Sequence, residues 1–194
     1  MMIQRRHFLS SMLAGGLGLT ACSRQESASV AKGPRRSPSV EILAAEAKGF
    51  TVGAMMNANT VYVMFDAQCP HCAHLWQAAI PLQKKAKFIW IPVGLLNTAS
   101  SSQGVALLSA ADPAQSMTEH EASMLAGSGG LSASANVAPS MEAALKANTR
   151  LFNELGVESV PFIIARNPRT GLTVTNSGSM GTAALAALIG VDWP

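Results

Sequence analysis

Hydrophobic residues follow two patterns along this chain: short continuous apolar runs, and longer stretches in which apolar residues recur every three or four positions. The short runs are rich in β-branched and aromatic residues and predict buried strands, whereas the longer stretches predict helices that pack on them. We expect strands at residues 50–56, 60–66, 87–93, 162–166 and 172–176. We expect helices at residues 40–48, 73–80, 97–115, 116–127, 140–155 and 182–189.

The order of these elements predicts an α/β fold with one large insertion. Residues 97–155 carry helical patterns, with a loop of low complexity at 128–139, and separate the earlier strands from the later ones. Gly156 marks the end of this helical block. Pro81 interrupts the helix that begins at residue 73 and is expected to kink or end it.

A possible reactive site, Cys69-Pro-His-Cys72, lies between the strand at 60–66 and the helix that follows. A strand, a short loop and a CxxC sequence that opens a helix form the thioredoxin-like redox signature. At a helix N-terminus, free backbone N–H groups and the positive end of the helix dipole favour an anion, so the pKa of Cys69 should be lowered. Cys72 lies one turn further along and is expected to resolve the mixed disulfide.

The two residues between the cysteines are expected to tune the pair. Pro70 suits the first helical turn, where its missing N–H would have no partner. His71 adds a hydrogen-bond donor or a partial positive charge beside the thiolate, which predicts an acidic and oxidising pair. Asp66, three residues before Cys69, either tunes the site or caps the turn.

A CxxC sequence also occurs in zinc sites, in haem attachment and in structural disulfides. A structural zinc site needs about four ligands, which the pair would have to recruit from the few histidines of the mature chain. Haem attachment requires a histidine directly after the second cysteine, where Ala73 stands. A purely structural disulfide is the remaining alternative. We therefore expect no metal, and no cofactor beyond a redox-active Cys69–Cys72 disulfide.

A second part of the signature lies near the end of the chain. Val160 and Pro161 lead directly into the apolar strand at 162–166. Pro161 is expected to follow a cis peptide bond and to pack beside the cysteines, with the backbone of Val160 offered to an extended substrate. A trans proline at a sheet edge is the alternative.

The N-terminal segment predicts export and attachment to a membrane. Residues 1–21 combine a charged start with an apolar stretch too short to span a bilayer, which is typical of a signal peptide. The paired Arg5 and Arg6 resemble a twin-arginine signal, although a general secretory signal also carries such pairs. Leu19-Thr-Ala-Cys22 resembles a bacterial lipobox, in which Cys22 is lipidated; an ordinary cleavage site is the alternative. Ser23 suggests the outer membrane.

The composition of the chain predicts a flexible tether and gives no indication of a nucleic-acid-binding surface. Residues 22–39 consist largely of Ser, Ala, Gly, Pro and basic residues, which predicts a flexible linker. The whole chain has a formal net charge of +3, but residues 40–194 contain eight basic and ten acidic side chains. The basic excess therefore belongs to the signal and the tether, and we expect one catalytic domain at 40–194 that binds no nucleic acid.

These motifs together resemble the catalytic domain of the DsbC/DsbG family of periplasmic disulfide isomerases, over about residues 50–190. The matching pieces are Tyr62-Val-Met-Phe-Asp-Ala-Gln-Cys-Pro-His-Cys72, Ala111-Asp-Pro-Ala114, Glu121-Ala-Ser123, and Leu155-Gly156 before Val160-Pro161. The resemblance implies that Cys69 is the nucleophile, Cys72 the resolving cysteine and Pro161 the cis-proline. It also implies a thioredoxin-like fold with a helical insertion, at about 97–155, between its βαβ and ββα halves.

Two departures from the family pattern affect the expected activity. Members of the family carry an N-terminal dimerisation domain, whereas only about 27 residues separate Cys22 from Gly49, so we expect a monomer. The family usually has Thr before the cis-proline, but this chain has Val160, as DsbA-type oxidases do.

The sequence therefore predicts a periplasmic thiol:disulfide oxidoreductase, anchored to a membrane by lipid, that reduces or isomerises disulfides in exported client proteins. A DsbD-like membrane partner would keep the pair reduced. The alternative is a DsbA-like oxidase that a DsbB-like partner keeps oxidised. A non-catalytic chaperone or binding lipoprotein is a third possibility.

Overall fold

The computed structural model describes residues 35–132 and 137–193. The predicted signal peptide (1–21), Cys22 and most of the predicted tether (22–39) lie outside the described residues and stay predictions. None of the described helices is long and apolar enough to cross a membrane. The described part begins close to the domain, because the backbone N–H of Arg36 donates to the carbonyl oxygen of Glu154 at 3.0 Å.

Helices and strands follow the predicted order. The helices are α1 (Val40–Glu46), α2 (Pro70–Ala79), α3 (Thr98–Ser109), α4 (Pro113–Leu125), α5 (Pro139–Glu154) and α6 (Thr182–Ile189), with a short 3₁₀ helix (Ile80–Leu82) after α2. The strands are β1 (Phe50–Gly53), β2 (Thr60–Asp66), β3 (Lys87–Val93), β4 (Phe162–Arg166) and β5 (Thr173–Ser177). The tightened turn after α2 contains Pro81, which ends the α-helix rather than kinking it.

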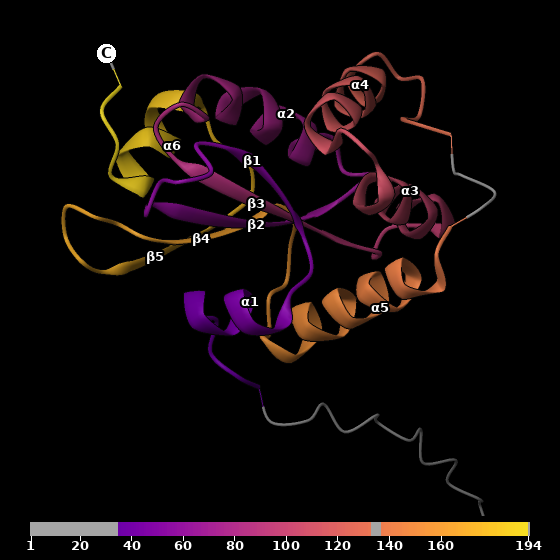
Figure 1. The fold of residues 1–194 in the computed structure, drawn as a ribbon, viewed down its shortest axis with the longest axis horizontal. Helices are drawn as coiled ribbons and strands as arrows, with labels where there is room; N and C mark the ends of the chain where they lie inside the picture. The colour runs from indigo at the N-terminus through magenta and orange to yellow at the C-terminus, as the bar shows by residue number, and fades with distance from the viewer. Residues whose placement is uncertain (1–34, 133–136, 194) are drawn as a thin grey trace, which may run out of the picture. The chain divides into compact units, whose positions relative to one another are not determined.

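The strands form one sheet in the order β1-β3-β2-β4-β5. β2 and β3 are parallel and the other pairs are antiparallel. Helices α2, α4 and α6 lie over one face of the sheet, and α1 and α5 lie over the other (Figure 1). The fold is therefore a mixed α/β fold in which α3, α4 and α5 are inserted between β3 and β4, which confirms the predicted fold class.

The central strand and its neighbour determine where the CxxC sequence lies. β2 is buried from Val61 to Asp66, because helices cover both faces of the sheet. Asp66, the last residue of β2, pairs with Val93, the last residue of β3. Since the two strands are parallel, the loops that follow them leave the sheet at the same edge.

Aromatic packing holds α2 against the sheet. The ring of Trp76 on α2 meets the ring of Trp90 on β3 edge to face, with centroids 5.1 Å apart. Trp90 in turn contacts Phe65 on β2 in the same geometry, at 5.6 Å. All three side chains are fully buried, so the helix that carries the cysteines is fixed to the two strands beneath it.

The boundary between the first two inserted helices differs from the prediction. The sequence placed Pro113 inside a helix at 97–115, but α3 ends at Ser109 and Pro113 is the first residue of α4. The side chain of Asp112 caps α4 by accepting a hydrogen bond from the N–H of Gln115 at 3.0 Å. An Asp cap followed by proline at the first helical position is a strong helix start, so the prediction was wrong here.

Candidate active site

Cys69 lies at the N-cap of α2, and Pro70 is the first residue of the helix. The carbonyl oxygen of Cys69 accepts hydrogen bonds from the N–H groups of Cys72 (2.9 Å) and Ala73 (3.3 Å), which hold the two cysteines one helical turn apart. Both thiols are free in this structure. The strand, the loop and the helix start thus place the pair where the sequence predicts it.

The two thiols have opposite pKa shifts. The pKa of Cys69 is lowered to about 6, first by a hydrogen bond from the Cys72 thiol and then by the N–H groups of Cys72 and His71 and the charge of His71, against the opposing effect of burial. The pKa of Cys72 is raised well above its ordinary value by burial and by the neighbouring sulfur of Cys69. Cys69 is therefore a thiolate at neutral pH while Cys72 keeps its proton.

The second sequence element meets the first in space. The Val160–Pro161 peptide bond is cis, which confirms that prediction. The thiol of Cys69 donates to the carbonyl oxygen of Val160 with an Sγ–O distance of 3.7 Å. Pro161 is buried just before β4, and Val160 is half-buried. The attacking sulfur thus lies directly beside the segment predicted to bind substrate.

An open groove of about 670 Å³ runs along this side of Cys69. Its exposed apolar side chains are Leu95 (37% exposed) and Leu96 (54% exposed), both on the loop after β3. Pro70 and His71 line the groove beside Cys69. The rest of its lining comes from the end of α5 and the segment before β4: Phe152, Asn153, Val157, Glu158, Ser159 and Val160. The groove can hold an extended chain with a sulfur atom next to Cys69.

Asp66 holds the loops on both sides of this groove. One oxygen of its buried carboxylate accepts a hydrogen bond from the N–H of Gln68 at 2.8 Å. The other accepts from the N–H groups of Leu95 (2.7 Å) and Leu96 (3.1 Å). The capping role considered from the sequence is therefore present, but it joins the active-site loop to the loop after β3.

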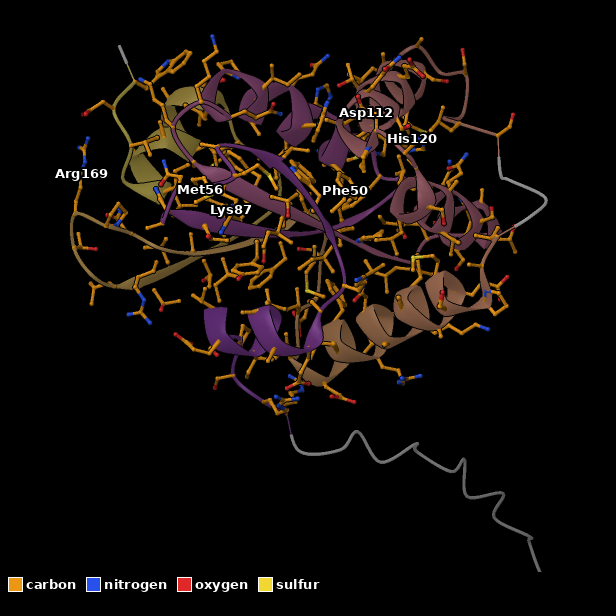
Figure 2. All side chains as sticks on the ribbon, in the orientation of Figure 1. Phe50, Met56, Lys87, Asp112, His120 and Arg169 are labelled. Atoms are coloured by element: carbon orange, nitrogen blue, oxygen red, sulfur yellow. The ribbon has the colours of Figure 1, made fainter. Side chains whose placement is uncertain are left out.

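His120 fastens the inserted helices to the active-site loop (Figure 2). Its Nε2–H donates to the carbonyl oxygen of Ala67 at 2.7 Å, and its Nδ1 accepts from the N–H of Leu131 at 3.0 Å. Burial lowers the pKa of this imidazole, and the two hydrogen bonds define a single neutral tautomer. The insert is thus bound to the main chain two residues before Cys69.

Glu121 is the residue of this site that sequence reasoning did not single out. Its side chain is only 1% exposed, and neither carboxyl oxygen has a hydrogen-bond partner. Burial, and to a lesser degree the charge of Cys69, raises the pKa of Glu121 to about 9. The sequence contained two weak signals: Glu121 opens the matching piece Glu121-Ala-Ser123, and it stands four positions after the apolar Met117 on the same helix face.

His71 and His74 on α2 are both exposed. Within residues 35–132 and 137–193, no three side chains of His, Cys, Asp or Glu lie close enough together to hold a metal ion.

Two curated proteins resemble this chain in sequence. The thiol:disulfide interchange protein DsbG of Escherichia coli is 33% identical over 105 residues, which cover 53% of this chain and 42% of the relative. The protein of the same name from Pseudomonas aeruginosa is 27% identical over 132 residues, covering 67% of this chain and 50% of the relative. The chain thus spans about half the length of these relatives or less. No protein-family model matches it.

A solved structure shows the same fold. A periplasmic thioredoxin-like protein from Salmonella enterica serovar Typhimurium superposes with a TM-score of 0.60 at 16% identity, covering 79% of this chain and 97% of that one. At this identity the likeness concerns the fold alone. The sequence similarity and the shared thioredoxin-like fold lead to one conclusion: over part of its length, this chain is homologous to the thiol:disulfide interchange protein DsbG.

Proposed function

We propose that this chain is a thiol:disulfide oxidoreductase that reduces or isomerises disulfides in exported proteins. The observation that carries the proposal is the position of Cys69: an acidic thiol at the start of α2, in contact with Val160 and open to a groove. The Cys69 thiolate attacks one sulfur of a client disulfide, forms a mixed disulfide and expels the other client sulfur as a thiolate. Cys72, or the client's second thiol, then breaks the mixed disulfide.

Compartment and partners follow from the same chemistry. The likeness to DsbG and to a protein described as periplasmic supports a periplasmic location. A reducing enzyme in an oxidising compartment needs a supply of electrons, so a membrane protein of the DsbD kind would return the pair to the dithiol form. A lipid on Cys22 would anchor the domain to a membrane, and the tether at 22–39 would let it work at a distance from that anchor.

A second candidate function is oxidation of client dithiols. Its support is the low pKa of Cys69, because a stable thiolate favours the reduced form and makes the disulfide a stronger oxidant. Val160 before the cis-proline favours the same direction. In this case a client thiolate attacks the Cys69–Cys72 disulfide, and a DsbB-like partner reoxidises the pair.

The redox state of the pair in living cells distinguishes the two directions. Cells that express the full chain are quenched in acid, free thiols are alkylated with a bulky maleimide, and adducts are counted on a gel, with the Cys69→Ser/Cys72→Ser variant as baseline. Two adducts more than this baseline support the reductase or isomerase. If the two adducts appear only after reductant is added, the pair is held oxidised in the cell, which supports the oxidase. Normal client maturation in cells carrying only the double variant would contradict both and favour a binding protein.

A further inference from the structure

Glu121 is buried on α4, the inserted helix that packs on the helix carrying the cysteine pair. Met117, one helical turn earlier on the same face of α4, packs in the core cluster that contains both Cys69 and Cys72. His120, the neighbour of Glu121, is bonded to the carbonyl oxygen of Ala67, two residues before Cys69. The Glu121 carboxyl is therefore buried beside the helix that carries the pair, and the charges of Glu121 and the two cysteines act on one another.

Within the described residues, the elements that pack most closely on α4 bring two buried ionisable groups toward it, Cys69 at the start of α2 and Cys72. Helix α4 contacts α2, α3 and β1, and neither α3 nor β1 carries an ionisable side chain. The neighbouring His120 is neutral, and Asp66 accepts three backbone hydrogen bonds at the end of β2. The other titratable side chains of these elements are exposed (His71, His74, Asp112 and Glu119).

A buried carboxyl without a hydrogen-bond partner is unfavourable, and folded proteins rarely keep one without a use. No ion pair or hydrogen bond gives Glu121 a structural role in the described residues. We propose that Glu121 exchanges a proton with Cys72, taking it when Cys72 attacks the mixed disulfide and returning it in the reverse reaction. This inference rests on the proposed thiol:disulfide chemistry and adds to it a residue that accepts and returns the Cys72 proton.

The step balances in atoms and electrons. The step starts from the mixed disulfide in which Glu121 has lost its proton: Cys69 is bonded to the client sulfur, Cys72 is a thiol and Glu121 is a carboxylate. The Cys72 proton moves to Glu121, the Cys72 sulfur forms a bond to the Cys69 sulfur, and the Cys69–client bond breaks. The products are the Cys69–Cys72 disulfide, a client thiolate and a neutral Glu121 carboxyl. In this step Cys72 is oxidised and the client sulfur is reduced, while Cys69 stays at the disulfide level.

The charge on Cys69 changes how readily Glu121 can take the Cys72 proton. Burial is the main cause of the raised pKa of Glu121, and the charge of the Cys69 thiolate adds to it and helps to keep the proton on this carboxyl. Formation of the mixed disulfide removes that charge, so the carboxylate becomes easier to form just when Cys72 must be deprotonated. A charge on Glu121 also raises the pKa of Cys72, which shows that the two groups influence each other.

A two-phase reaction separates the roles of the two cysteines. The reduced full-length protein is mixed with one equivalent of an aromatic disulfide whose released thiolate is yellow. The first release reports attack by Cys69, and the second reports resolution by Cys72. In Glu121→Gln the second phase should slow by about tenfold or more near pH 7, while the first phase changes by less than about twofold.

Matched variants keep the test specific. Met117→Leu alters packing on the same face of α4 without removing an ionisable group and should keep both phases. Glu121→Asp retains a carboxyl and should recover part of the second phase. Equal second phases in Glu121→Gln and the parent at every pH from weakly acidic to alkaline would overturn the inference. A parent protein that shows no first phase would instead refute the proposed function.

A second measurement does not depend on the folding of a variant. The carboxyl carbon of Glu121 is followed by NMR through a pH titration of the parent in its dithiol and disulfide forms. The carboxyl should titrate at a lower pH in the disulfide form, because the Cys69 charge is then absent. Identical titrations in the two forms would show that Glu121 is uncoupled from the pair and would overturn the inference.

Discussion

The sulfur of Cys69 and the carbonyl oxygen of Val160, 91 positions apart in the chain, lie 3.7 Å from each other. This contact joins the start of α2 to the segment that enters β4, so the nucleophile and the predicted substrate-binding backbone form one surface. Ionisation of Cys69 removes the thiol proton that this carbonyl accepts. The carbonyl is then free to accept a hydrogen bond from the backbone of an extended client.

The rate at which Cys69 is alkylated should depend on pH through the ionisation of the Cys69 thiol. Because only the thiolate reacts, the rate should rise with pH and reach half its maximum near pH 6, where the Cys69 pKa is placed. Cys72→Ala removes the largest cause of the lowered pKa and should move the midpoint upward by more than His71→Ala does. Stopped-flow alkylation across pH gives the three midpoints. A parent midpoint near pH 9, or a larger shift in His71→Ala, would contradict the electrostatics described for this site.

Removal of the resolving thiol should trap clients. In Cys72→Ser no second thiol of the protein can attack the mixed disulfide on Cys69, so covalent client complexes should accumulate. In Cys69→Ser they should be absent, because the remaining thiol is buried and has a raised pKa. Non-reducing gels of acid-quenched cells measure these complexes. Equal amounts of complex in the two variants would show that the assigned roles are wrong.

Asp66→Asn should loosen the groove and destabilise the fold. An amide cannot accept as well as a carboxylate, and its NH₂ group would meet a backbone N–H, so the free energy of unfolding should fall by roughly 2–4 kcal/mol. Chemical denaturation measures this loss. Asp112→Asn is the matched control, because Asn also caps helices well and this residue is exposed. Equal, small effects in both variants would mean that the Asp66 hydrogen bonds contribute little.

Glu121 should make the reduced protein less stable as the pH rises. Its carboxyl has an ordinary pKa of 4.5 and a folded-state pKa of about 9. Between these values the folded state binds one proton more than the unfolded state, so the free energy of unfolding decreases with increasing pH. Relative to Glu121→Gln, the parent should lose about 1.4 kcal/mol per pH unit in this window. Denaturation under reductant at several pH values tests the slope, and parallel curves would contradict it.

Local sequence signals predicted most of the fold and the centre of the site. A buried strand, a CxxC sequence and a Val-Pro pair each have a signature confined to a few neighbouring residues, so β2, α2 and the cis-proline could be predicted. Asp66 and Glu121 were different, because their environments depend on contacts with loops and helices distant in sequence. No periodicity shows that Leu95 and Leu96 return to Asp66, or that one acidic residue of α4 faces two cysteines.

The hydrogen bonds of Asp66 reach the groove through the main-chain N–H groups of Leu95 and Leu96, so neither side chain takes part in them. Every residue except proline offers the same N–H. We therefore expect other side chains at these two positions to leave the Asp66 hydrogen bonds and the thiol chemistry in place. Client preference and redox chemistry should then be separable in this domain, with Leu95 and Leu96 as the positions at which to change the choice of client.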